Sequence, residues 1–188
     1  MKNLLVLVFT FCTLAVFGQD GIKTIERKGF VFGVGLSGGV ISISDSENEV
    51  PFDDSQGGIS LPNLKIGWMV NDRLAVLATF PGMVYKYEGK DRSFDAFMPS
   101  VQYWIKDRWW INGGIGLAID GPALYENLDN EDWNFGCAVA ASAGYEIVQK
   151  KRFALDLQTQ LHLARVSLDN DEHRDGVVFT VGLGFNWY

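Results

Sequence analysis

The chain has 188 residues, enough for one domain of ordinary size and too few for two full ones. Hydrophobic residues make up 47% and charged residues 21%, which argues against intrinsic disorder. The net charge of −7 argues against a nucleic-acid partner held by a basic surface. Two cysteines are too few for a disulfide-rich scaffold or a cysteine-based structural zinc site.

An export segment opens the chain. Lys2 precedes an apolar stretch over residues 4–17, which is shorter than the roughly 20 residues of a transmembrane helix but suits a signal peptide. The small residues Val16 and Gly18 predict cleavage before Gln19. From the N-terminus, the predicted organisation is a signal peptide at 1–18, a short segment at 19–29, and one domain at 30–188.

Eight segments with period-two alternation follow. In the clearest, residues 133–147, Trp133, Phe135 and Val139 share one face with other apolar residues, whereas the opposite face is mostly glycine, alanine and serine. The other segments, in chain order, are 30–43, 59–70, 74–87, 93–105, 109–119, 153–164 and 177–188.

The connections between these segments differ in length. Short turns are expected at residues 71–73, 106–108 and 149–152. The other connections are mostly longer and are expected at 44–58, 88–92, 120–132 and 169–175. An even number of strands, with short turns at one end and longer loops at the other, is typical of outer-membrane barrels. The sequence therefore predicts an all-β fold, an eight-stranded antiparallel up-and-down transmembrane β-barrel. The outer-membrane β-barrel is expected at 30–188, with its short turns toward the periplasm and a short periplasmic segment at 19–29 before it.

A soluble barrel of the lipocalin sort is the alternative. Its outer face would be wet, so lysine and glutamate should alternate along the strands. Segments 109–119, 133–145 and 177–188 contain no charged residue. Their second face of small residues suits a narrow packed lumen, which favours the membrane barrel.

Aromatic residues gather beside the short turns and the C-terminus, as five of the six tryptophans show: Trp68, Trp104, Trp109, Trp110 and Trp187. Aromatic rings prefer the headgroup level of a bilayer. The predicted periplasmic girdle comprises Trp68, Tyr103, Trp109, Tyr145, Phe153 and Trp187, and the neighbouring Trp104 and Trp110 are expected to join it. The predicted outer girdle comprises Tyr85, Tyr87, Phe94, Trp133 and Phe179.

The last eight residues, Val181-Gly-Leu-Gly-Phe-Asn-Trp-Tyr188, resemble the closing strand of small outer-membrane barrels of the OmpA/OmpX type. The resemblance implies an outer-membrane location and contact with outer-membrane lipid and lipopolysaccharide. It also implies that the barrel-assembly machinery recognises Phe185, Trp187 or Tyr188. No peptidoglycan-binding domain is expected, and the fold leaves the activity open because it hosts structural proteins, adhesins and lipid-modifying enzymes.

Polar side chains on the non-lipid faces should point into the barrel, and they form the predicted lumen cluster of Lys65, Glu146, Asp156, Gln158, Gln160 and His162. Charges in a narrow lumen must pair, so a plug of hydrogen bonds and ion pairs is expected around Lys65, Glu146 and Asp156. Eight strands leave room only for side chains, which disfavours an open pore. A narrow channel for small solutes remains an alternative.

The longer loops are acidic, and solvated loops that repel neighbouring molecules are the simplest interpretation. Weak Ca²⁺ candidates are Asp129, Glu131, Asp169 and Asp171, but none has the spacing of an EF-hand. No metal or cofactor is therefore assigned. We expect a monomeric, non-enzymatic protein with an envelope-structural role or a surface-interaction role through its acidic extracellular loops.

A lipid-modifying enzyme is the alternative function. It would need a histidine, a serine and an acid near the outer leaflet, and His162, Ser167 and Asp169 are the candidates. No motif marks Ser167 as a nucleophile, and a lumen histidine that hydrogen-bonds to glutamine or aspartate explains His162 more simply. We therefore assign no catalytic residue.

Overall fold

The structure is a computed structural model that describes residues 25–46, 55–126, 132–168 and 171–188. It contains nine strands, which are β1 (Phe30–Asp45), β2 (Ser55–Asn71), β3 (Leu74–Phe80), β4 (Gly82–Tyr87), β5 (Lys90–Trp104), β6 (Trp109–Pro122), β7 (Asn134–Lys150), β8 (Phe153–Ser167) and β9 (His173–Trp187). No helix within the described residues has the length and apolar character to cross a bilayer. The predicted signal peptide and its cleavage point lie outside these residues.

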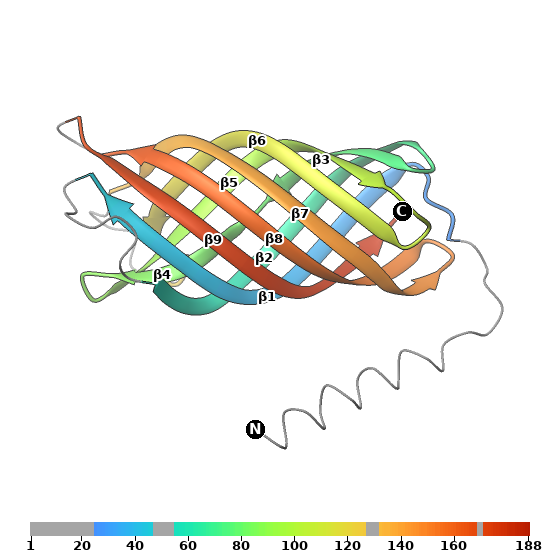
Figure 1. The fold of residues 1–188 in the computed structure, drawn as a ribbon, viewed down its shortest axis with the longest axis horizontal. Helices are drawn as coiled ribbons and strands as arrows, with labels where there is room; N and C mark the ends of the chain where they lie inside the picture. The colour runs from blue at the N-terminus through green and yellow to red at the C-terminus, as the bar shows by residue number, and fades with distance from the viewer. Residues whose placement is uncertain (1–24, 47–54, 127–131, 169–170) are drawn as a thin grey trace, which may run out of the picture.

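The strands form one antiparallel sheet that closes on itself, because β3 pairs with β2 on one side and with β5 on the other. β3 and β4 are two parts of one run, interrupted at Pro81, and both pair with β5. Proline has no N–H to donate to a ladder, so the break falls where it stands. With β3 and β4 counted as one, the nine strands correspond to the eight predicted barrel strands, which are strongly tilted around the barrel (Figure 1).

Strand ends at the longer-loop end differ from the predicted ones. β1 runs to Asp45, β6 to Pro122, and β9 begins at His173, so residues expected in loops belong to strands. The connection expected over residues 88–92 is a tight hairpin turn, in which both central residues have a positive φ, Glu88 of 50° and Gly89 of 82°. The barrel wall therefore stands taller at this end than the sequence indicated.

The two faces of the wall differ as expected for a membrane barrel. Large apolar side chains such as Ile115, Val139 and Phe179 point outward and are exposed. Inward positions hold polar or small residues together with a few large rings. A continuous apolar exterior of this kind suits hydrocarbon, where only a closed sheet can satisfy its backbone.

Glycines make room for the large rings inside the barrel. A Cβ on Gly144 would come within 2.3 Å of the Trp110 ring, and one on Gly176 within 2.2 Å of the Phe94 ring. Gly113 faces outward, and a Cβ there would meet only one atom, at 3.8 Å. The inward glycines are therefore packing positions.

Gly144→Val should destabilise the barrel, because overpacking a filled interior costs about 1–3 kcal/mol. The temperature at which the folded band disappears in heat-modifiable gel mobility should fall. Gly113→Val is the matched control and should leave that temperature nearly unchanged. An equal fall in both variants would contradict the assignment of Gly144 to the packed interior.

Candidate functional site

A buried cluster around Glu146 closes the end of the barrel that bears the short turns. The Glu146 carboxylate accepts hydrogen bonds from Trp104 Nε1 at 2.8 Å and the Tyr188 hydroxyl at 3.0 Å. Arg27 Nη2 donates to it at 2.6 Å, and the guanidinium lies over the Trp104 ring, 4.8 Å from its centroid. Residues 25–29, expected to be a periplasmic segment, thus enter the barrel mouth, where Ile25 is buried.

The middle of the lumen holds the remaining members of the predicted polar cluster. Lys65 Nζ donates to Gln158 at 3.1 Å and lies 3.9 Å from the centroid of the Trp110 ring. Asp156 accepts from Trp110 Nε1 at 3.0 Å and from Asn186 at 2.7 Å. One further contact is Asn63 to Gln160, 3.2 Å.

Hydrogen bonds surround Lys65 and Asp156, whereas the ion pair of Glu146 is formed with a residue outside the predicted cluster. Among the described residues, Lys65 makes no ion pair of 4.0 Å or less with Glu146 or Asp156; the partner of Glu146 is Arg27. Arg27 lies 119 residues from Glu146 in the chain, so periodicity could not have indicated this pair.

A second buried cluster closes the opposite, outer end. Asp120, fully buried, accepts hydrogen bonds from Arg174 Nη1 at 2.9 Å, Arg92 Nε at 3.2 Å and the Tyr85 hydroxyl at 2.9 Å. Arg174 also donates to Asp45, 2.8 Å from its Oδ2. The sequence placed Asp45, Asp120 and Arg174 in solvated loops, and this was wrong. They are inward positions of extended strands, where a buried charge must be paired.

His162 lies between the two clusters and is buried against Phe94, with their ring centroids 6.0 Å apart. Neither ring nitrogen hydrogen-bonds to a described residue, so the expected bond to glutamine or aspartate is absent. Ser167, five residues along β8, points to the opposite face of the wall. His162 and Ser167 therefore cannot form a nucleophile–base pair, and Asp169 lies outside the described residues.

Ser167 instead lies opposite His173 across the β8–β9 ladder. His173 Nε2 is 3.9 Å from Asp175 Oδ2, beyond hydrogen-bond distance. Both Asp175 oxygens accept from Arg165, at 2.6 and 2.7 Å. With its acid engaged by Arg165, this group lacks the linked hydrogen bonds of a catalytic triad.

The predicted periplasmic girdle residues face outward at the end with the short turns. Trp109 contacts Tyr145 with ring centroids 4.9 Å apart, and Phe153 contacts Trp187 at 5.5 Å. Trp68 and Tyr103 are also exposed. The prediction was wrong for rings that point into the lumen, and these are Trp104 and Trp110 at this end and Tyr85, Tyr87 and Phe94 at the other.

The terminal aromatic residues alternate as well. Phe185 and Trp187 are exposed on the outer face, whereas Tyr188 is buried and bonded to Glu146. Recognition by the barrel-assembly machinery stays a prediction. Of the weak Ca²⁺ candidates, Asp171 is exposed, whereas Asp129, Glu131 and Asp169 fall outside the described residues. Where the chain is described, no group of three or more His, Cys, Asp or Glu could hold a metal ion.

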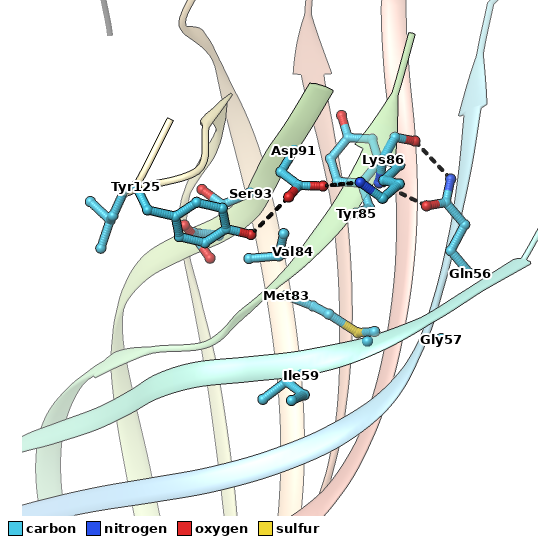
Figure 2. Close-up of a pocket in the computed structure, with 13 residues that line it drawn as sticks. Gln56, Gly57, Ile59, Met83, Val84, Tyr85, Lys86, Asp91, Ser93 and Tyr125 are labelled. Atoms are coloured by element: carbon cyan, nitrogen blue, oxygen red, sulfur yellow. Dashed lines mark hydrogen bonds and ion pairs between the residues drawn. The ribbon is translucent and has the colours of Figure 1, made fainter. Parts of the chain in front are cut away.

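A cleft of about 580 Å³ opens in the wall at the outer end, between β2 and β4. Figure 2 shows its lining, to which Ile59, Val84 and Met83 contribute apolar groups. The exposed side chains of Leu124 and Tyr125, which follow β6, form another side. Its volume falls within the roughly 300–1,000 Å³ of small-molecule sites. No sequence pattern had indicated it, because the cleft arises where two strands fail to pair.

Side chains bridge this part of the wall. The Gln56 carboxamide donates to the Lys86 carbonyl at 2.8 Å and accepts from the Lys86 backbone N–H at 2.7 Å, as a strand peptide would. The Lys86 ammonium and the Tyr125 hydroxyl each donate to a different oxygen of Asp91, at 2.9 and 3.1 Å (Figure 2). These hydrogen bonds, that from Lys86 above all, hold the pKa of Asp91 below its ordinary value.

Comparison with solved structures shows the same fold in small outer-membrane barrels. Neisserial surface protein A matches with a TM-score of 0.56 and 15% identity, over 83% of this chain and 96% of that one. Ail, the attachment invasion locus protein of Yersinia pestis, matches with a TM-score of 0.50 and 11% identity, over 85% and 99%. No family model matches the sequence, and neither does any curated protein. The predicted fold class and the resemblance to small outer-membrane barrels are confirmed, and the apolar outer face is that of a barrel whose wall contacts hydrocarbon.

Asp120→Asn should destabilise the protein strongly, because it removes the buried carboxylate that Arg92 and Arg174 share. Breaking a buried pair in this way costs about 3–5 kcal/mol. Asp175→Asn removes a carboxylate from an exposed pair, which contributes about 0–1 kcal/mol. Urea unfolding in lipid vesicles, followed by tryptophan fluorescence, measures both variants; similar losses would contradict the outer cluster.

Proposed function

We propose that the protein is a non-enzymatic, non-conducting barrel of the outer membrane that acts through its outer rim. The observation that carries this proposal is the filling of the lumen by side chains at both ends. The Glu146 cluster closes one mouth and the Asp120 cluster closes the other.

The buried clusters argue against the narrow-channel alternative. Each of them holds an arginine and a carboxylate in direct contact, and opening either mouth would separate charges that lie out of water. Between the mouths, Phe94, Met98 and His162 are each buried, so side chains occupy the space that a solute would need. An eight-stranded barrel has no other interior route.

The outer rim offers what the lumen does not. Exposed Leu124 and Tyr125 stand beside a cleft that is open to the outside, and Asp91 and Asp95 contribute carboxylates to its lining. Exposed apolar side chains next to charged ones are typical of interaction sites. A surface-interaction role is therefore favoured over a purely structural one.

The first test is electrical. The full chain, reconstituted into planar lipid bilayers, should show no steady conductance, because both mouths are closed. The Arg27→Ala, Arg174→Ala double variant removes one arginine from the Glu146 cluster and one from the Asp120 cluster. If it folds, it should conduct more often than the unaltered protein. A large steady conductance from the unaltered protein would refute the closed-lumen proposal.

The second test addresses the enzyme alternative. His162→Ala and Ser167→Ala, each expressed in cells that lack the native copy, should leave the outer-membrane lipid composition unchanged by mass spectrometry. The reason is geometric, since these two side chains lie on opposite faces of β8. Loss of a lipid species in either variant, and not in the Gly113→Val control, would support an enzyme instead.

A further inference from the structure

We propose that the outer cleft binds a membrane lipid with an ammonium-bearing headgroup, which enters between β2 and β4 so that its ammonium group meets Asp95 while its acyl chains extend toward the centre of the membrane. This inference rests on the proposed function, since it assigns a ligand class to the outer rim. It follows from three observations: an unpaired seam in the wall, an apolar lining that continues into the lipid-facing belt, and a carboxylate without a counter-charge.

The seam is a local failure of strand pairing. The β2–β3 ladder ends at Leu64↔Phe80, and beyond it β4 pairs with β5 alone. The other neighbouring strands remain laddered near their outer ends, for example to Asp45↔Arg174 between β1 and β9. In the described residues, β2 and β4 are instead linked by side chains, namely Gln56 to Lys86 and the Ser60 hydroxyl to the Gly82 carbonyl. The wall can therefore admit part of a lipid here without breaking a backbone ladder.

The lining of the cleft continues the lipid-facing surface. Ile59 and Val84 point outward from β2 and β4. Toward the centre of the membrane, the exposed rings of Phe80 and Phe97 lie against each other, with centroids 5.0 Å apart. The acyl chains of a lipid whose headgroup occupies the cleft would thus extend over these rings into the bilayer, which makes a membrane lipid a better occupant than a soluble ligand.

The charges of the cleft select the headgroup. Both oxygens of Asp91 are engaged, one by Lys86 and one by Tyr125. Asp95 lines the same cleft, is half-buried on the outer face, and makes no ion pair with any described residue. A partly desolvated carboxylate is stabilised by a cation with several N–H donors. A lipid ammonium group supplies one, whereas an anionic headgroup would be repelled.

Gly82 keeps the place of Asp95 open. A Cβ on Gly82 would lie 1.7 Å from Asp95 Oδ1, so the carboxylate sits where any other residue would put its side chain. Gly82→Ala must therefore move the Asp95 carboxylate while leaving the net charge unchanged. This gives a perturbation of the proposed site that is independent of charge removal.

The test uses the full chain, purified in detergent and stripped of lipid in the presence of EDTA. Phosphatidylethanolamine and phosphatidylglycerol with identical acyl chains are added separately, and retained lipid is counted by native mass spectrometry. Phosphatidylethanolamine should be retained at least tenfold more than phosphatidylglycerol. Asp95→Asn and Gly82→Ala should each bring this ratio close to one, and Ile59→Trp should reduce retention of both lipids by filling the cleft.

Asp175→Asn is the matched control, because it removes a carboxylate from the outer face of β9, away from the cleft, and should keep the tenfold preference. Equal retention of the two lipids by the unaltered protein would overturn the inference, as would a preference that survives in both Asp95→Asn and Gly82→Ala. If one of these variants does not fold, the other decides. If the unaltered protein shows no preference between the two lipids and no conductance, only the lipid assignment is overturned. A steady conductance of the unaltered protein would overturn the proposed function.

Discussion

The constraint on which the whole structure depends is that backbone groups in hydrocarbon must find their partners within the protein. A sheet meets it only by closing, and here β3 closes the sheet by pairing with both β2 and β5. Closure fixes two faces for every strand, one toward lipid and one toward a lumen with room only for side chains. The outward apolar belt and the inward glycines that admit Trp110 and Phe94 both follow from this geometry.

The narrow lumen in turn decides how the charges are arranged. A carboxylate that points inward cannot reach bulk water, so Glu146 and Asp120 each recruit an arginine and aromatic N–H or O–H donors. Arg27 comes from the segment before the first strand, and Arg174 from the beginning of the last. The segment before the first strand and the beginning of the last strand thus supply these arginines, which links closure of the barrel to closure of its mouths.

Much of this could be predicted from alternation, and the errors show where alternation was not followed far enough. The barrel strands, the short turns between them and the outward positions of Trp109 and Trp187 follow from the period-two alternation of apolar residues. Trp104 and Trp110 were assigned to the girdle from their position beside a turn, although their neighbours Tyr103 and Trp109 already occupy the outward phase. Their place in the lumen was therefore present in the sequence.

Other features lay beyond a one-dimensional pattern. The contact of Arg27 with Glu146 joins segments that only the closed barrel brings together. The taller wall at the outer end depends on the pairing of Asp45, Arg92, Asp120 and Arg174, which reads in sequence as scattered loop charges. The cleft depends on the absence of pairing between β2 and β4, and no pattern of residues in the sequence predicts where a strand ladder is missing.

The same constraint explains why the cleft is the exceptional place in the molecule. Elsewhere in the described wall, backbone pairs with backbone and lumen charges mostly meet partners, so little remains for a ligand to satisfy. At the seam, by contrast, the Gln56 carboxamide replaces a strand peptide, and Asp95 faces outward with no cation from the described residues. A barrel whose interior is filled can interact only through its exterior. The Asp95 carboxylate and the apolar lining of the cleft lie beside the outer rim, so a ligand of this protein should be sought there.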